Sequence, residues 1–119
     1  MAENQDIVFS AKATDVATRF VEAGFFKARS EAALFAAAYI IRTQFRTFDP
    51  ATFVSDSNGS NYGYGTFDPD GRWSRLLTAM YGTDKPRLFL KNLMIYGLET
   101  IGDNIEKAGG IIQITDYIA

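Results

Sequence analysis

The sequence predicts a mainly α-helical fold that opens with one short β-strand. Apolar residues recur at helical intervals through most of the chain, and glycines stand where several of these runs end. A β-branched and aromatic run near the N-terminus has the composition of a strand instead. The 119 residues, 47% hydrophobic and 22% charged, are enough for one globular domain with a buried core.

The first predicted element is a strand over residues 6–10 (DIVFS). Side chains alternate along a strand, so Ile7 and Phe9 are expected on one side and their neighbours on the other. A lone strand leaves its backbone hydrogen-bonding groups unpaired. It therefore needs a partner, which we expect to be either a second copy of the chain or the C-terminal run at residues 111–114.

Two helices are expected next. Apolar residues between positions 13 and 21 follow the spacing of an amphipathic helix, and Gly24 stands where a C-terminal cap belongs. Ser30 is the expected N-cap of a second helix that runs to Ile41. Because this helix is apolar nearly all round, we expect it to be central, with a second subunit as cover. The sequence thus predicts a homodimer or higher homo-oligomer.

The middle of the chain, residues 47–69, is predicted to be a polar loop rich in Gly, Ser, Asn and Tyr. The tetrapeptide Thr-Phe-Asp-Pro occurs at 47–50 and again at 66–69. In both places Asp is expected to cap a helix whose first residue is Pro. Residues 55–61 between them are rich in turn formers, and residues 62–65 are expected to form a hairpin arm or an interface tip.

Helical order resumes in the C-terminal half, residues 70–119. Gly82 is expected to end one helix, and Asp84 to cap a longer one that stops at residues 109–110. The shorter helix has an apolar face formed by Trp73, Leu76, Leu77 and Met80. The longer helix has two apolar stripes, Leu90, Met94, Leu98, Ile101 and Ile105, and Phe89, Leu93 and Tyr96.

These elements define three regions and a fold class. Residues 1–46 form a dimerisation unit of one strand and two helices, residues 47–69 form the polar loop, and residues 70–119 form a helical half that packs on the same core. Residues 111–118 are apolar enough for a terminal strand or a docking segment. The class is therefore mainly α, with a strand and two helices followed by a two-helix half.

The composition excludes most catalytic chemistry. The chain has neither cysteine nor histidine, which removes thiolate metal sites, most zinc sites and the commonest general base. Residues 68–71 (Asp-Pro-Asp-Gly) lack the ligand series of a calcium loop, and residues 63–65 (Gly-Tyr-Gly) lack the context of a phosphate-binding loop. We therefore expect a non-enzymatic protein with no catalytic residues, no metal and no cofactor.

Charge and hydropathy bear on location and partners. The net charge is −2 and the pI is about 5.0, so overall attraction to nucleic acid is weak and a DNA contact needs a local basic patch or an assembly. No apolar run reaches the roughly 18 to 20 residues of a membrane helix. The acidic N-terminus, residues 1–6, is unlike a secretory leader. These observations predict a cytoplasmic protein without a membrane partner.

The order of strand, helix, tight turn and second helix resembles a ribbon-helix-helix unit. Residues 24–32 (GFFKARSEA) are similar to that family's turn, where a glycine and an aromatic residue precede a basic-Ser-Glu-Ala helix start. In the family, the strands of two subunits pair and enter the major groove of DNA. The N-terminus of the second helix meets backbone phosphate.

Carried over by position, the resemblance implies which residues contact DNA. The exposed strand side, with Asp6 and Val8, would face the groove, and the start of the second helix would meet phosphate. Family members that bind DNA usually have Lys, Arg, Asn, Gln or Thr on that strand side, and Asp6 would repel phosphate. The residues assigned to DNA contact are Ser10, Lys27, Arg29 and Ser30.

A second resemblance extends further along the chain. Residues 26–38 (FKARSEAALFAAA) and 95–101 (IYGLETI) are similar to patterns in small proteins associated with bacterial DNA phosphorothioation systems. The chain departs from them at Tyr39-Ile40, where they usually have Leu-Gly. It also has only Arg42 and Arg46 in place of an arginine-rich run. This resemblance implies a prokaryotic accessory protein of a DNA-modification or phage-defence locus.

Two functions of different classes follow. The leading hypothesis is a ribbon-helix-helix-like protein associated with double-stranded DNA or with transcription regulation. The alternative is a protein–protein assembly subunit with no nucleic-acid role, which the acidic pI favours. A coherent positive surface around Arg29 would support DNA binding, and a surface of mixed charge would support the assembly role.

Overall fold

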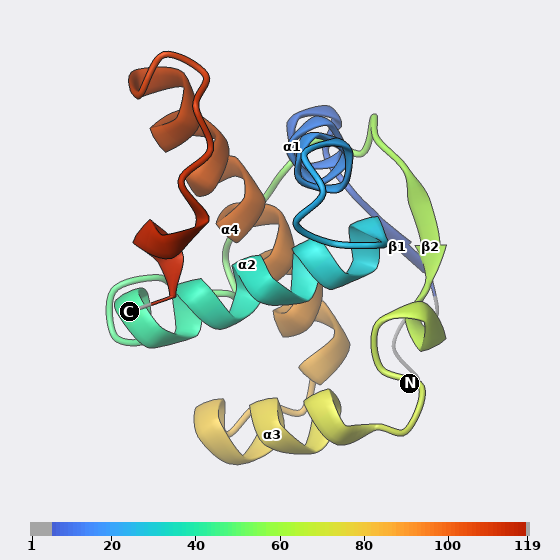
Figure 1. Ribbon diagram of the computed structural model, residues 1–119. Helices are drawn as coiled ribbons and strands as arrows, with labels where there is room; N and C mark the ends of the chain where they lie inside the picture. The colour runs from blue at the N-terminus through green and yellow to red at the C-terminus, as the bar shows by residue number, and fades with distance from the viewer. Residues whose placement is uncertain (1–5, 119) are drawn as a thin grey trace.

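The computed structural model describes residues 6–118, and this part of the chain folds into four α-helices and a two-stranded antiparallel sheet (Figure 1). The predicted mainly helical class is confirmed. The elements are β1 (Asp6–Val8), α1 (Ala11–Glu22), α2 (Arg29–Gln44), β2 (Asn61–Gly63), α3 (Arg72–Tyr81) and α4 (Pro86–Lys107), with short 3₁₀ turns η1 (Tyr64–Thr66) and η2 (Ile114–Tyr117).

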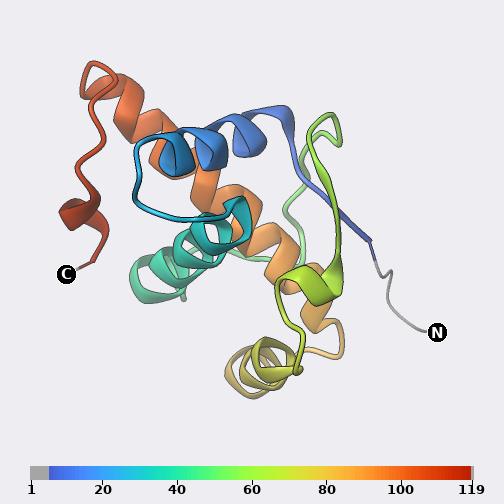
Figure 2. The same cartoon turned by 45° about the vertical axis from the view of Figure 1, so that its right-hand side comes forward.

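Helix α4 is the centre of the fold and contacts each of the other three helices (Figures 1 and 2). Its fully buried side chains run from Leu90 to Ile105, as the predicted stripes require. A Cβ atom on Gly97 would lie 2.5 Å from the carbonyl oxygen of Ala36, so this glycine lets the backbones of α2 and α4 cross closely. The side chains of α2 that pack towards the core are Ala32, Ala33, Ala36, Ala37 and Ile40.

The glycines predicted to end helices do so. Gly24 follows α1 with a φ of +85°, and Gly82 follows α3 with a φ of +65°. A side chain is strained in this left-handed region, whereas glycine adopts it freely. Helix α4 likewise stops just before the glycines at residues 109–110.

Strand β1 finds a partner within the chain, and the C-terminal run expected as one possible partner is not it. It pairs with β2, with Ile7 opposite Tyr62. Ile7 and Phe9 are buried as the alternation predicts, and the Phe9 ring lies 5.0 Å from the Tyr62 ring between centroids. An asparagine and a glycine flank Tyr62, and neither favours strands. The sequence pattern therefore does not indicate a strand at β2.

The segment predicted as a polar loop therefore contains β2 and η1. The residues just before β2 are bonded to the start of α1. The N–H of Gly59 donates to the Phe9 carbonyl at 2.8 Å, and that of Ser60 donates to Oγ1 of Thr14 at 2.9 Å. A Cβ atom on Gly59 would lie 2.3 Å from the Ser10 carbonyl oxygen, so only glycine fits there.

Of the two Thr-Phe-Asp-Pro segments, only the second precedes a helix. The carboxylate of Asp68 accepts hydrogen bonds from the backbone N–H groups of Trp73 at 2.9 Å and Ser74 at 3.0 Å. Asp68 thus caps the first turn of α3, as predicted, but from outside the helix. Gly71 holds the cap position and Pro69 precedes the helix.

Two other predicted caps are wrong. Asp49 accepts a hydrogen bond from the N–H of Ala51 at 2.9 Å within a turn, and no helix follows it. Ahead of α4, the hydroxyl of Thr83 accepts from the N–H of Lys85 at 2.9 Å, where Asp84 was expected to cap. A short polar side chain stabilises a turn as readily as a helix start, so sequence does not separate the two.

Of the two expectations for the C-terminal segment, the strand is wrong and the docking segment is confirmed. Residues 111–113 are irregular and are followed by η2. The Tyr117 ring packs against the Tyr39 ring with centroids 5.0 Å apart, and Arg42 donates a hydrogen bond to the Tyr117 carbonyl. The segment docks on α2 because Tyr117 is buried there, away from the sheet.

Candidate macromolecule-binding surface

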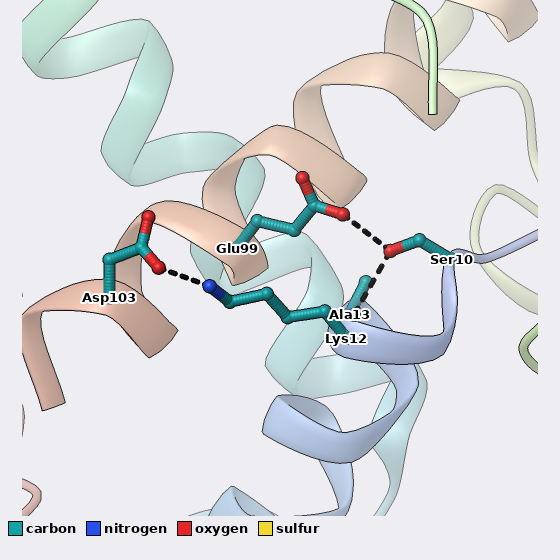
Figure 3. A network of polar contacts seen from close by, with 5 residues as sticks. All are labelled: Ser10, Lys12, Ala13, Glu99 and Asp103. Atoms are coloured by element: carbon teal, nitrogen blue, oxygen red, sulfur yellow. Dashed lines mark hydrogen bonds and ion pairs between the residues drawn. The ribbon is translucent and has the colours of Figure 1, made fainter. Parts of the chain in front are cut away.

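Ser10 is buried, contrary to the groove-facing position expected for it. Its hydroxyl oxygen accepts from the N–H of Ala13 at 3.0 Å, and its O–H donates to Oε2 of Glu99 at 2.6 Å (Figure 3). Strand β1 ends at Val8, so the alternation of a strand no longer applies at Ser10. With 0% of its surface exposed, Ser10 caps α1 and is closed to a ligand.

A second contact lies beside it. The ammonium of Lys12 on α1 is bound to the carboxylate of Asp103 on α4 (Figure 3). This hydrogen bond raises the pKa of Lys12, so the side chain stays charged. Both side chains are exposed enough for solvent to weaken the ion pair. The two contacts hold the start of α1 to α4. The polar groups that make these contacts are engaged with each other.

At the start of α2, the carboxylate of Glu31 occupies the backbone N–H groups just before the helix. Oε1 of Glu31 accepts from the N–H groups of Lys27 at 3.0 Å and Ala28 at 3.1 Å. The helix begins at Arg29 with Ala28 in the cap position, so the prediction of Ser30 as the cap is wrong. An anion that approaches this end meets the Glu31 carboxylate, where a phosphate-binding helix offers free N–H groups.

Arg29 is engaged within the chain. Its Nη1 donates to Oγ of Ser60 at 2.9 Å, and its guanidinium carbon lies 5.7 Å from the centroid of the Tyr62 ring. Such a cation–π contact adds to the hydrogen bond. Arg29 therefore links α2 to β2. Sequence analysis missed this role because both partners lie more than 30 positions away in the chain.

Three of the four predicted DNA contacts come together at this turn, and Ser10 does not. Lys27 is exposed, while Arg29 and Ser30 are half-buried. The turn also contains two exposed acids, Glu22 and Glu31. The surface around Arg29 is thus mixed in charge.

The outer side of α2 is apolar and only half-buried. At 100° per residue, Leu34, Ala38 and Ile41 point away from the alanines that pack on α4. Phe45, just after the helix, continues this spacing and is 37% exposed. The outer side of α2 therefore presents apolar surface near its C-terminal end.

Helix α3 presents a second apolar surface next to the first. Leu77 is buried against the core, whereas Leu76 and Met80 on one flank of the helix are 45% and 38% exposed. The Phe45 and Tyr81 rings are in contact with centroids 4.7 Å apart, so the C-terminal ends of α2 and α3 meet. We name the exposed apolar side chains at the end of α2 and on α3 the α2–α3 face, which consists of Phe45, Leu76 and Met80.

Four arginines belong to the two chain segments that carry the α2–α3 face. Residues 42–46 and 72–81 contain four arginines and no acidic residue. Arg42, Arg46, Arg72 and Arg75 are all exposed. Arg72 pairs with Asp70 at 3.3 Å, but both side chains are more than half exposed, so the pair is weak. The two segments that carry the face are therefore basic as well as apolar.

A buried polar network fixes the start of α3. The Asp68 carboxylate accepts from Oγ of Ser74 at 2.9 Å and from the hydroxyl of Tyr64 at 3.3 Å. Burial raises the pKa of Asp68, but hydrogen bonds from Trp73 and Ser74 outweigh it and lower the pKa below the usual value. Burial raises the pKa of Tyr64 to about 12, so its hydroxyl stays protonated. The Arg87 guanidinium lies 4.7 Å from the Tyr64 ring centroid.

Between residues 6 and 118, no three acidic or other metal-binding side chains gather closely enough to hold an ion. A pocket of about 400 Å³ beneath the C-terminal segment is lined by Tyr39 and Asn104 among others, with Asp116 as its single carboxylate. It therefore lacks the pair of acids that hydrolysis without histidine or cysteine requires.

No helix in the stretch from residue 6 to residue 118 combines the length and the apolar character needed to cross a bilayer.

One member of the α2–α3 face, Phe45, was not singled out from sequence. The signal was present, because positions 34, 38, 41 and 45 continue one helical stripe. The helix was expected to end at Ile41, and α2 in fact runs to Gln44. The exposure of Leu76 and Met80 was not predictable, since their spacing also fits a buried helix face.

Comparisons of the chain with protein-family models, curated proteins and solved structures find no match.

Proposed function

We propose that this protein is a non-enzymatic, cytoplasmic binding subunit of a multi-component assembly, and that it docks onto another protein through the α2–α3 face. The single observation that carries the proposal is the exposure of Phe45 just after α2 and of Leu76 and Met80 on α3, each 37% or more exposed, where the Phe45 and Tyr81 rings bring the two helix ends together. Among the described residues, seven large hydrophobic side chains are exposed, and three of them belong to this face.

The composition of the face supports a protein partner. Exposed apolar surface of this kind, rimmed by polar groups, is typical of interaction sites. Aromatic residues, methionine and arginine are enriched at protein interfaces, and all three are present. Burying the apolar side chains under a partner would contribute about 25 cal/mol for each Å² removed from water.

Affinity capture from cells that carry the gene natively tests this docking. Leu76→Gln with Met80→Gln removes the apolar centre and keeps helix formers, while Val54→Gln changes an apolar side chain that is 86% exposed elsewhere. We expect partners retained by the wild type and by the Val54 variant to be lost from the double variant. The retained protein is then purified and titrated, and its affinity is expected to fall about tenfold or more.

Identical behaviour of the wild type and the double variant would overturn the proposal. Circular dichroism and the fluorescence of Trp73, the single tryptophan, provide the control for folding. Nuclease treatment before capture separates a protein partner from one bridged by DNA.

Association with DNA, in transcription regulation or in a DNA-modification or phage-defence system, is a second candidate. Lys27 is exposed beside the first turn of α2, where the helix dipole favours anions, and Arg29 lies two residues further on. The Glu31 carboxylate at the same turn opposes this candidate.

A duplex-DNA shift titration at low and at moderate salt tests it. DNA binding through this turn predicts an affinity that falls steeply with salt and is lost in Lys27→Glu combined with Arg29→Glu. Because Arg29 also holds Ser60, Lys27→Glu alone is measured first, against Lys107→Glu as the matched control. Absence of a shift at low salt would remove the DNA candidate and leave the assembly role.

A further inference from the structure

We infer that Asn58 is a site of non-enzymatic deamidation, and that the loop of residues 56–60 protects it for as long as this loop stays bound to the start of α1. Asn58-Gly59 is the single Asn-Gly pair of the sequence. Asn58 is exposed, whereas the backbone of Gly59 is held against the start of α1. This site lies outside the α2–α3 face, so it is independent of the proposed docking function.

The Asn-Gly pair can modify itself with water as the one co-reactant. The backbone nitrogen of Gly59 loses its proton to hydroxide and attacks Cγ of Asn58, which forms a new C–N bond and a five-membered succinimide ring. The bond from Cγ to the side-chain nitrogen breaks, and this nitrogen takes a proton from water and leaves as ammonia. Water then opens the ring. Attack at Cγ gives aspartate, and attack at the backbone carbonyl gives isoaspartate. Because glycine has no Cβ, its backbone hinders this ring closure least.

The fold engages the nitrogen that would attack. The N–H of Gly59 donates to the Phe9 carbonyl at 2.8 Å, so this bond must break before the nitrogen can lose its proton and turn towards Cγ. The next N–H, that of Ser60, donates to Oγ1 of Thr14 at 2.9 Å. A Cβ atom on Gly59 would lie 2.2 Å from the same Oγ1, so the backbone has no room to rotate in place.

Asp56 holds the other end of the loop. Its Oδ1 accepts from the N–H of Ala11, the first residue of α1, at 3.1 Å and from the N–H of Asn58 at 3.0 Å. The loop accordingly lies beside the junction of β1 and α1 (Figures 1 and 2). The backbone on both sides of Asn58 is fixed, and ring closure requires the loop to leave α1 first. The rate of deamidation should then follow the population of the open loop.

Isoaspartate at position 58 would prevent the loop from closing again. The main chain of isoaspartate runs through Cβ and Cγ, so it is one carbon longer before Gly59. Because Gly59 fits tightly against α1, the extra length displaces at least one of the hydrogen bonds made by residues 59 and 60. Strand β2 begins at Asn61, directly after these bonds, so the modified chain is expected to pair β1 with β2 less stably.

The first test compares the folded and the unfolded chain. Both are incubated at mildly alkaline pH, one in buffer and one in guanidinium chloride, and mass spectrometry follows the peptide that contains residue 58. We expect the unfolded chain to deamidate at Asn58 at least about tenfold faster than the folded one. Asn58→Gln in guanidinium chloride is the chemical control, because its longer side chain would have to close a six-membered ring, and it should deamidate far more slowly.

A matched pair of variants tests the role of the loop. Thr14→Val and Thr18→Val each replace a half-buried threonine of α1. Thr14 accepts from Ser60 in the loop, whereas Thr18 is bonded to the Thr14 carbonyl within the helix. Loss of one hydrogen bond should make Asn58 of folded Thr14→Val deamidate about two- to tenfold faster. Thr18→Val should stay within about twofold of the wild type.

A third variant keeps the test decisive if Thr14→Val folds poorly. Asp56→Ala removes the exposed acceptor at the other end of the loop and should also speed deamidation about two- to tenfold. Ser57→Ala is its control at an exposed neighbour and should change the rate less than about twofold. Urea unfolding of every variant separates opening of the loop from unfolding of the whole chain.

Three results would overturn the assignment. If the unfolded chain does not deamidate at Asn58, the site does not exist. If the folded and unfolded chains react equally fast, the loop does not protect it. If Thr14→Val and Asp56→Ala react no faster than their controls, the bonds to α1 are not the protection. Isoaspartyl protein isolated after incubation should unfold at a lower urea concentration than fresh protein, and equal stability would overturn the expected loss of closure.

Discussion

Asp68 and Ser10 show how a polar side chain can be buried beside a helix start. Each accepts hydrogen bonds from backbone N–H groups that have no partner within the helix. Each is also bonded to a second polar side chain, Asp68 to Ser74 and Ser10 to Glu99. Removing either side chain would leave these groups unsatisfied, which is the costly outcome for a buried polar group.

Asp68→Asn is expected to lower the free energy of unfolding by about 1–2 kcal/mol at neutral pH. The folded-state pKa of Asp68 is lowered, so the stabilisation by its carboxylate is fully present above the unfolded pKa. It is lost as the pH falls through the folded pKa. Urea unfolding of both proteins along an acid series should therefore show the stability gap shrinking. A gap that is independent of pH would contradict the lowered pKa.

Ser10→Ala is expected to cost about 1–2 kcal/mol, because it removes the cap of α1 and the hydrogen bond to Glu99. Ser57→Ala, at an exposed position in the middle segment, is the matched control and should change stability little. Urea unfolding measures both variants. Equal stability of the two would show that Ser10 does not hold α1 in place.

At the scale of elements, the crossing of α2 and α4 depends on small residues. Alanines on α2 face Gly97 on α4, where a Cβ atom would come within 2.5 Å of the Ala36 carbonyl oxygen. Backbone atoms at this distance cannot rotate away, so the helices would have to separate. The contact thus sets how closely the two central helices pack.

Gly97→Ala is expected to destabilise the fold by about 1–3 kcal/mol or more through overpacking. Gly65→Ala is the matched control, because a Cβ atom there meets nothing within 4 Å and its φ is not positive. Thermal unfolding followed by circular dichroism compares the two. If Gly97→Ala unfolds at the wild-type temperature, the crossing is looser than the structure indicates.

The helices were predictable from sequence and the sheet was not. A helix depends on residues three and four positions apart, so the stripes of α1 and α4 appear directly in the sequence. Strand β2 depends on β1, whose Ile7 is paired with Tyr62 far along the chain. The hydrogen bond between Arg29 and Ser60 and the burial of Ser10 also depend on residues far apart in the sequence, so local patterns did not indicate them. Local periodicity predicts where helices form. Contacts between segments that are distant in the sequence decide which side chains stay available to a ligand.

At the scale of the whole molecule, one apolar cluster joins both halves of the chain. Buried side chains from β1, α1, α2, η1, α3 and α4 all belong to it. The outer side of α2, which the sequence assigned to a second subunit, remains half-buried. The homo-oligomer stays a prediction.

Light scattering over a range of protein concentrations tests the oligomer. A dimer or larger species is expected, and Leu76→Gln with Met80→Gln should leave its mass unchanged, because the α2–α3 face is proposed to bind a different protein. A monomer at every concentration would make the predicted oligomer wrong. Loss of the oligomer in the double variant would identify the face as a contact between copies.

The pairing of β1 with β2 also has a consequence for synthesis on the ribosome. Tyr62 follows its partner Ile7 by 55 positions, so at 5–20 residues per second the first strand waits about 3 to 11 s for the second. During that interval α1 and α2 can form, but the backbone of β1 has no β2 to form hydrogen bonds with. Translation speed through the middle of the gene thus sets how long this edge is open to wrong pairing, and rare codons there would lower the yield of folded protein.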